Sequence, residues 1–271
     1  MNSPTSLSPC RHRVISPRKS ARPLRKTACI LAMALVCLLL SLQEAQAQPK
    51  PPPNVLFRPA FLTPDLAHYA GLAFRLEDEK SGLHYLVTAH SLFGPAADLD
   101  VQMTSDDISR VIVAAVGVSC TDPRSVVMAR RYLPLPDARR ADEKGADKDI
   151  AMFELPARLG ERALRLDPDV PLRGDKVWVY VKYPGTARVG LEPATLAWVA
   201  DGELRYLLQN QGADLRGSTG APVLAADGTV VGMHLGVFTA ATGRKFGFAS
   251  PAMALRRVFE PGAKNPATIL K

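Results

Sequence analysis

The chain has 271 residues, 47% of them hydrophobic and 22% charged, which is the composition of a globular protein rather than a disordered one. Its formal net charge is +8, but the first 47 residues hold seven basic residues against one acid, Glu44, so the rest of the chain is nearly balanced. The remaining Arg pairs are scattered and form no basic stripe, so we expect no nucleic-acid partner.

The N-terminal segment has the pattern of a cleavable export signal. Residues 11–27 carry only basic charge, residues 28–42 are almost wholly apolar, and Ala45 and Ala47 are small residues at the positions that a signal peptidase reads. The apolar run is shorter than a membrane-spanning helix requires, which disfavours an uncleaved anchor. We therefore expect residues 1–47 to be a signal peptide, and the mature protein to be periplasmic or secreted and free of the membrane.

The cysteines are distributed so that the mature chain can form no internal disulfide. Cys10, Cys29 and Cys37 fall in the signal segment, which leaves Cys120 alone. We expect Cys120 to be a small buried residue rather than a reactive thiol, and the domain to be stabilised by its hydrophobic core.

After the signal, the pattern is that of an all-β chain. Residues 48–65 are interpreted as a Pro-rich leader, because the prolines over 48–53 disfavour both helix and central strand. From residue 66 onward, short runs rich in β-branched and aromatic residues alternate with turn signals, and Ser81-Gly82 predicts a hairpin. The predicted strands span residues 69–76, 83–88, 111–118, 126–129, 150–155, 176–183, 195–199, 205–209, 222–224, 230–235 and 245–249.

Helical spacing is found only near the end, over residues 252–259, and a tail of residues 261–271 follows. Many short strands without βαβ alternation predict a sandwich or a barrel. A shift in composition over residues 156–173 places the boundary between two halves of the chain there.

Three segments carry side chains suited to nucleophilic catalysis. His90 stands where an apolar strand gives way to a loop, and Asp149 directly precedes another apolar strand. In the third segment, Gly217-Ser218-Thr219-Gly220-Ala221-Pro222-Val223, glycines flank a hydroxyl residue in a tight turn. Such a turn allows successive backbone N–H groups to point at one oxyanion. Each segment alone is also compatible with a purely structural role.

In this order, the three segments resemble the motifs of the trypsin-like (chymotrypsin-fold) serine proteases, and residues 247–251 resemble the closing segment of the bacterial trypsin-like peptidase domain. The resemblance implies an all-β fold of two six-stranded antiparallel barrels with a short C-terminal helix over residues 66–260. Barrel one would span about 66–157 and barrel two about 172–250. It also implies a polypeptide substrate and neither cofactor nor metal.

The resemblance further implies a role for each site residue. Asp149 would orient His90, and His90 would take the proton from the nucleophile at position 219 and return it to the leaving amine. The backbone N–H groups of Gly217 and Thr219 would stabilise the oxyanion.

Position 219 departs from the family, which has serine there. The methyl group of Thr219 restricts its χ1 angle in a crowded turn, and Ser218 lies one place too early to substitute. One hypothesis is an endopeptidase with a His-Asp-Thr triad. A second is a catalytically impaired, protease-like module that binds peptides, and a third is an unrelated secreted β-rich protein.

Two residues give conflicting indications of substrate preference. His234 resembles the histidine of the acidic-residue pocket in glutamyl endopeptidases, although a core histidine fits the pattern equally well. Asp214, five residues before Thr219, would favour a basic side chain instead. The sequence therefore predicts no cleavage preference, and it leaves the oligomeric state open.

Overall fold

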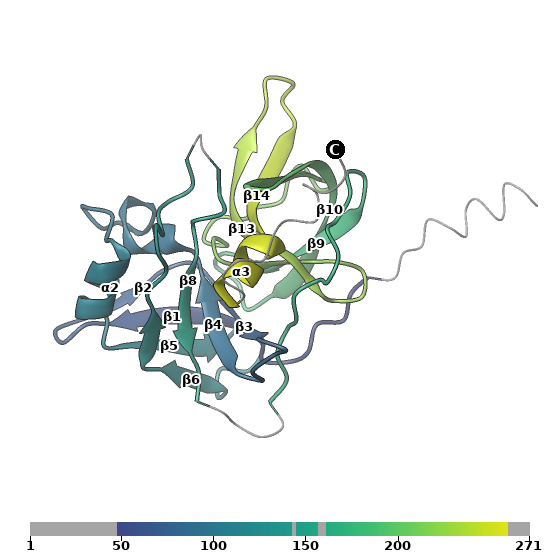
Figure 1. The fold of residues 1–271 in the computed structure, drawn as a ribbon. Coiled ribbons are helices and arrows are strands. Elements are labelled where there is room, and N and C mark those ends of the chain that lie inside the picture. Colours follow the sequence, from purple (N-terminus) through teal and green to yellow (C-terminus); the bar gives the residue numbers. More distant parts are fainter. Residues whose placement is uncertain (1–47, 143–144, 157–160, 260–271) are drawn as a thin grey trace, which may run out of the picture. The chain divides into compact units, whose positions relative to one another are not determined.

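The computed structural model describes residues 48–142, 145–156 and 161–259, and in these ranges the chain consists mainly of β-strands in two sheets (Figure 1). The predicted signal peptide, residues 1–47, and the tail, residues 261–271, lie outside the described residues. Two barrel-like sheets with few helices confirm the predicted fold class.

The first sheet is nearly closed and has more strands than predicted. Its hydrogen-bonded order is β6-β5-β1-β3-β4-β8-β7, with β2 paired to β1, which makes eight strands rather than the expected six. The expected strand over residues 69–76 is interrupted at Gly71, which has a φ of +58°. The strands are β1 (Leu56–Leu62), β2 (Ala67–Tyr69), β3 (Ala73–Glu77), β4 (His84–Thr88), β5 (Ala114–Ser119), β6 (Val126–Ala129), β7 (Arg131–Leu133) and β8 (Ala151–Glu154).

Strand β1 corrects the predicted leader, because it lies inside residues 48–65 and is a central strand of the first sheet. Pro59 is tolerated there because on one side of β1 the partner changes, from β3 at Phe57 to β2 at Ala60. Pro59 has no partner on that side, so its missing N–H breaks no ladder bond. The leader without strand or helix is therefore shorter, and residues 48–53 fall within it.

The second sheet is a closed barrel of six strands, as predicted, in the order β10-β11-β14-β13-β12-β9. Its strands alternate apolar residues or carry continuous apolar runs, which suits a wall that is buried on one or both faces. The strands are β9 (Lys176–Lys182), β10 (Val189–Ala200), β11 (Glu203–Leu208), β12 (Pro222–Leu224), β13 (Val230–Thr239) and β14 (Lys245–Pro251).

The structure contains the predicted terminal helix, α3 (Ala252–Phe259), and a second helix that periodicity missed, α2 (Ser105–Val111). Helix α2 begins with a capping box, in which the Thr104 side chain accepts from Asp107 N–H and the Asp107 side chain accepts from Thr104 N–H. Short 3₁₀ turns, η1 (His90–Phe93) and η2 (Pro95–Ala97), follow β4.

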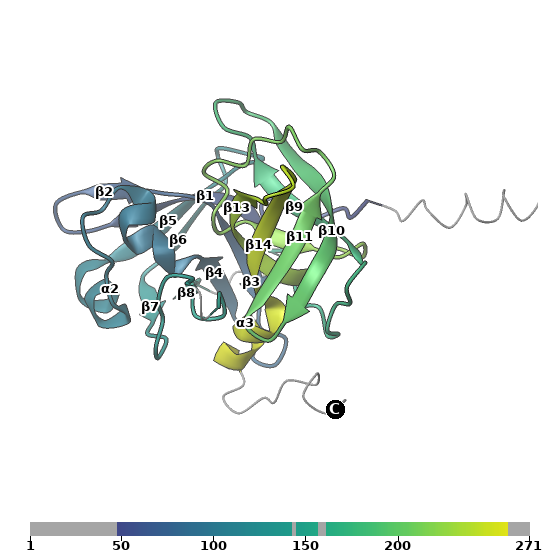
Figure 2. The ribbon, with the colours of Figure 1, turned by 90° about the horizontal axis from the view of Figure 1, so that it is seen from above.

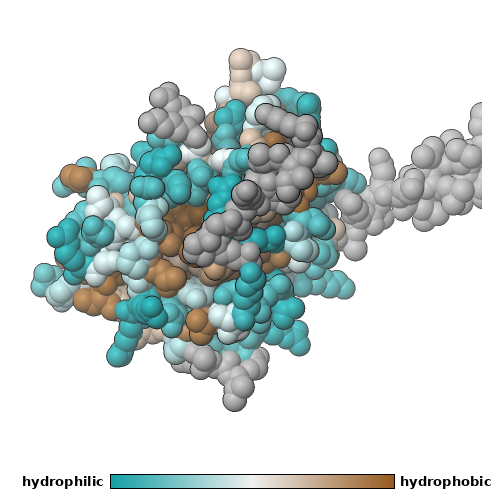
Figure 3. All heavy atoms as spheres, viewed as in Figure 1, coloured by the Kyte–Doolittle hydropathy of each residue, from teal (hydrophilic) through white to brown (hydrophobic). Residues whose placement is uncertain are grey.

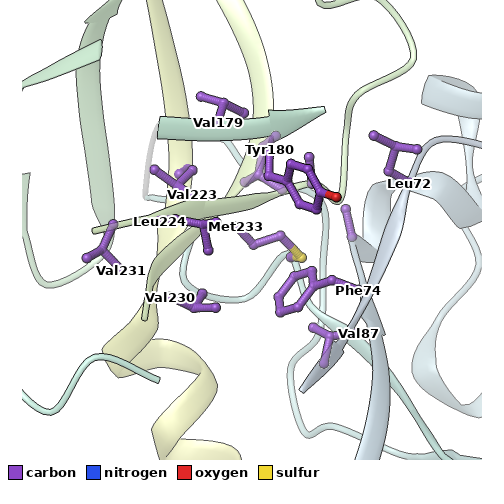
Figure 4. Packing of buried hydrophobic residues seen from close by; sticks show 14 of the residues in the cluster. Leu72, Phe74, Val87, Val179, Tyr180, Val223, Leu224, Val230, Val231 and Met233 are labelled. Carbon is purple, nitrogen blue, oxygen red and sulfur yellow. The ribbon is translucent and has the colours of Figure 1, made fainter. Parts of the chain in front are cut away.

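The two sheets pack against each other through a shared apolar core. Phe74 and Val87 of the first sheet, and Leu72 just before β3, face barrel residues such as Met233 of β13 (Figure 4). Helix α3 lies beside this junction in both ribbon views (Figures 1 and 2). Apolar residues gather near the centre of the face shown in Figure 3, which is otherwise mainly polar. The ends of β4, β8 and the β11–β12 loop are thereby fixed relative to one another.

Candidate active site

The first half of the site is formed where β4 ends and β8 begins. These strands pair in antiparallel register, with Thr88 opposite Ala151, so residues just beyond their ends are neighbours. His90 follows β4 and Asp149 precedes β8, and each side chain is only 1% exposed. The Ser91 N–H donates to Asp149 Oδ1 at 2.7 Å. The fold therefore brings Asp149 next to the turn that carries His90.

The Asp149 carboxylate is held by backbone N–H groups on both oxygens. Besides the bond from Ser91, the Ala141 N–H donates to Oδ2 at 3.0 Å. Burial raises the pKa of Asp149, and the two backbone donors and the charge of Arg140 oppose that rise. The Asp149 carboxylate is thus held in a fixed orientation and shielded from water, and it can accept hydrogen bonds.

The His90 imidazole does not donate to Asp149 in this structure. Its Nδ1 is buried and has no hydrogen-bond partner among the described residues. Burial lowers the pKa of His90, because the charged imidazolium loses hydration, and a backbone hydrogen bond to Met103 opposes this in part. The imidazole is therefore biased toward the neutral form that a general base requires.

Gln102 supports the His90 turn and was not anticipated from the sequence. Its Nε2 donates to the carbonyl oxygens of His90 and Phe93, at 3.0 and 3.2 Å. A Cβ at Gly94 would lie 2.2 Å from Gln102 Oε1, so only glycine leaves room for this amide. No sequence signal marks Gln102, because its partners are main-chain atoms.

The second half of the site is the loop before β12. Gly217 and Gly220 have φ angles of +72° and +90°, which glycine adopts without strain. The Ser218 hydroxyl is buried and donates to the carbonyl of Leu215, so it points into the loop. Thr219 is half-buried, and its Oγ1 donates to the carbonyl of Leu235 at 3.0 Å.

Leu72 joins the two halves through its backbone. Its N–H donates to Thr219 O at 2.8 Å, and its carbonyl accepts from Thr88 Oγ1 at 2.7 Å. Gly220 packs so closely here that a Cβ would lie 2.1 Å from Leu72 O. The loop carrying Thr219 is therefore held against the end of the strand that leads to His90.

Two backbone donors of the loop are available to a ligand. Neither Gly217 N–H nor Thr219 N–H has a hydrogen-bond acceptor among the residues that the structure describes. They flank Ser218, whose own N–H donates a hydrogen bond to Leu215 O at 3.1 Å. This spacing suits stabilisation of an oxyanion by two donors.

An open pocket of about 520 Å³ adjoins Thr219. Asp214 lines it, as the sequence suggested. Its lining residues are Gly212, Ala213, Asp214, Leu215, Arg216, Gly217, Thr219, Gly236, Val237 and Lys245.

His234, in contrast, lies outside that lining and in the barrel core. It is 1% exposed, and its Nδ1 is hydrogen-bonded to the hydroxyl of Tyr206. Burial lowers the pKa of His234 to about 3. The structure thus supports the interpretation of His234 as a core histidine. It corrects the assignment of His234 to the substrate pocket, because the side chain is buried inside the barrel and bound to Tyr206.

The other features considered from the sequence lie apart from this site. Cys120 is buried, and burial raises its pKa to about 11, so its thiol is protonated at neutral pH. In the described ranges, no three His, Cys, Asp or Glu side chains are grouped so that they could hold a metal ion. Within those same ranges, no helix has the length and apolar character needed to cross a membrane.

Comparison with known proteins shows that this chain matches a sequence family and shares its fold with solved structures. The family model described as "Trypsin-like peptidase domain" matches residues 71–233, more than half of the chain. The active form of the Rv3671c protease from M. tuberculosis is 15% identical, with a TM-score of 0.51, over 81% of this chain and 90% of that one. The serine endoprotease from Yersinia pestis is 12% identical, with a TM-score of 0.50, over 77% of this chain and 62% of that one. No curated protein matches this chain in sequence.

Proposed function

Because the chain belongs to the family of trypsin-like peptidase domains, we propose that it is an extracytoplasmic endopeptidase acting through His90, Asp149 and Thr219. The observation that carries the proposal is the pair of backbone contacts around these residues. Ser91 N–H binds Asp149 beside His90, and Leu72 N–H binds the carbonyl of Thr219. These contacts hold the chain segments of His90, Asp149 and Thr219 near one another, which supports the proposal.

The proposed reaction needs one nucleophile, one base and two oxyanion donors. Thr219 Oγ1 attacks the scissile carbonyl carbon while His90 accepts the hydroxyl proton, and the carbonyl oxygen becomes an oxyanion held by Gly217 and Thr219 N–H. The carbon–nitrogen bond then breaks, and His90 returns the proton to the leaving amine. Water, activated by His90, hydrolyses the acyl-threonine ester. Each oxyanion donor is worth about 3–4 kcal/mol in such reactions.

Two rearrangements are required before this chemistry can begin. Thr219 must give up its hydrogen bond to Leu235 O and rotate toward His90, and the lost bond costs about 1 kcal/mol. His90 must turn its Nδ1 toward Asp149. Each carboxylate oxygen has two lone pairs and one backbone donor, so Asp149 retains room for an imidazole N–H. We therefore expect slow hydrolysis that a serine at position 219 would accelerate.

A second candidate function is peptide binding without efficient turnover. The observations that favour it are the bond of Thr219 Oγ1 to Leu235 O and the unpartnered Nδ1 of His90. In this alternative, the pocket beside Thr219 holds a side chain of a bound peptide, and the loop donors bind its carbonyl oxygen.

The extracytoplasmic location rests on the signal pattern of residues 1–47. We expect the exported protein to begin at Gln48, which N-terminal sequencing of the mature form would test. Recovery of an uncleaved, cell-associated chain would argue against this part of the proposal.

The catalytic part is tested with the exported protein and an unfolded protein substrate. We expect slow cleavage by the wild type, faster cleavage by Thr219→Ser, and none by His90→Ala or Thr219→Ala. An inactive wild type with an active Thr219→Ser variant would support the binding function. Wild-type cleavage that persists in His90→Ala would contradict the assignment of the triad.

A further inference from the structure

The pocket beside Thr219 contains three charged side chains, Asp214, Arg216 and Lys245. The sequence suggested Asp214 as a recognition residue for basic side chains, so its surroundings decide what the pocket can bind. The charges of all three residues must therefore be considered together.

Asp214 is already paired within the pocket. Arg216 Nε donates to Asp214 Oδ1 and Oδ2 at 2.9 and 3.1 Å, and Nη2 donates to Oδ2 at 2.6 Å. The Arg216 backbone N–H also donates to Oδ1, at 3.1 Å. These bonds lower the pKa of Asp214 to about 2. A basic substrate side chain would have to compete with Arg216 for the same carboxylate.

Lys245 gives the pocket one more positive than negative charge, and this charge also helps to lower the pKa of Asp214, which is already bound to Arg216. Lys245 is half-buried at the start of β14, and it forms no salt bridge with any described residue. Its backbone is anchored, since Lys245 N–H donates to Gln211 Oε1 at 2.6 Å. The cation is thus attached to a fixed strand end rather than to a free loop.

The remaining lining suits the methylene groups of a side chain. Ala213, Leu215 and Val237 contribute apolar atoms, and no lining residue besides Asp214 is acidic. An acidic side chain could therefore extend along apolar walls and pair with Lys245, whereas a basic one would meet a like charge.

We propose that this pocket selects an acidic side chain of a polypeptide, and that Lys245 is the residue that determines this specificity. The inference rests on the proposed function, because it assigns the substrate class of the same site. Arg216 contributes less, since its side chain is 85% exposed and already bound to Asp214.

The test uses three labelled peptides that differ only in having Glu, Gln or Lys at one position, and it measures both affinity and cleavage with the exported protein. Affinity is measured by fluorescence anisotropy in the Thr219→Ala background, so that turnover cannot deplete the probe. We expect the Glu peptide to bind about 2- to 5-fold more tightly than the Gln peptide, the range for one partly shielded ion pair. The Lys peptide should bind most weakly.

Substitutions at Lys245 give the decisive comparison. Lys245→Met should remove the preference for Glu over Gln, and Lys245→Glu should shift the preference to the Lys peptide. Arg244→Met is the matched control, because Arg244 is the adjacent exposed cation and does not line the pocket. It should leave the preference for Glu unchanged.

Affinity and cleavage separate the two proposals. Preferential binding of the Glu peptide without cleavage of any peptide would support the specificity of the pocket and overturn the peptidase function. Cleavage with equal or better binding of the Lys peptide would overturn the specificity and leave the peptidase function standing. Failure of all three peptides to bind, or loss of the Glu preference in Arg244→Met, would also overturn the inference about Lys245.

Discussion

The two halves of the candidate site differ in how their backbones are constrained. On the first sheet, side chains bind backbone groups, as when Gln102 binds the carbonyl of His90 and Asp149 binds the N–H of Ser91. On the second barrel, the Thr219 loop combines side-chain bonds from Ser218 and Thr219 with backbone-to-backbone bonds, such as Gly220 N–H to His234 O at 2.8 Å. It also contains two glycines with positive φ, Gly217 and Gly220.

This difference predicts different sensitivities to substitution. A side chain that binds a backbone group can be removed with the loss of one or two hydrogen bonds. A backbone that requires positive φ and a near contact cannot accept a Cβ without moving. We therefore expect the loss of one side-chain bond in the first half to weaken the site gradually, and a Cβ at Gly220 of the second half to disrupt it.

The largest effect is expected for Gly220→Ala. The new Cβ would lie 2.1 Å from Leu72 O and 2.7 Å from Thr88 Oγ1, at a φ of +90°. We expect the free energy of unfolding to fall by about 3 kcal/mol or more, because both backbone strain and overlap with another strand must be relieved. Urea denaturation measures this difference.

Gly228→Ala is the matched control for that experiment. Gly228 has a φ of +92°, but a Cβ there would meet nothing within 4 Å. The strain alone should lower the free energy of unfolding by about 1 kcal/mol. Equal losses in the two variants would show that contact with Leu72 does not hold the loop against the first sheet.

An intermediate effect is expected on acidification from pH 7 to pH 5, through the buried His234 of the second barrel. Its pKa in the folded protein is about 3, below its ordinary value of 6.5, so the unfolded chain binds a proton more readily. Its contribution to stability is complete above pH 6.5 and is lost as the pH falls toward 3. The slope from this one group is at most about 1.4 kcal/mol per pH unit.

Replacement of His234 separates this contribution from other titrating groups. His234→Gln keeps a polar partner for Tyr206 and should flatten the dependence of unfolding free energy on pH between 4 and 6. Tyr206→Phe keeps the imidazole and should preserve the slope. If His234→Gln retained the wild-type slope, another group would be responsible, such as His90, whose pKa is also lowered by burial.

The sequence predicted best those features that depend on local pattern. Short apolar runs predicted β6 and β12 with their observed bounds, and the turn at Ser81-Gly82 joins the paired strands β3 and β4. Strand β1 was missed because Pro59 argues against a central strand, and only the change of partner along β1 makes it acceptable.

The finer arrangement of the site could not be read from sequence. On β13 all residues from Val230 to Leu235 are buried, so alternation gives no sign of which side chains face the pocket and which face the core. His234 was therefore compatible with both. The pairing of Asp214 with Arg216 is local, two residues apart, and could have been suspected from the sequence. The backbone partners of Asp149 could not, because the Ala141 and Ser91 N–H groups that bind it are present in every residue but proline.

The smallest effect is expected on the first sheet, at Gln102. Gln102→Ala removes two hydrogen bonds to main-chain carbonyls and should lower the free energy of unfolding by about 1 kcal/mol, whereas the exposed Gln209→Ala should change nothing measurable. Gln102→Glu should be worse than alanine at pH 7, because a carboxylate would face the carbonyl oxygens of His90 and Phe93, and protonation at pH 4 should narrow the difference.

Activity distinguishes a positioning role for Gln102 from a purely structural one. If Gln102 orients His90 through the backbone of its turn, Gln102→Ala should lower kcat and leave KM nearly unchanged, since the pocket that binds substrate lies on the other half of the site. A change in KM alone would mean that the two halves are coupled through the substrate. The gradual response expected of the first half would then no longer hold, because its side chains would also shape the binding surface formed by the second.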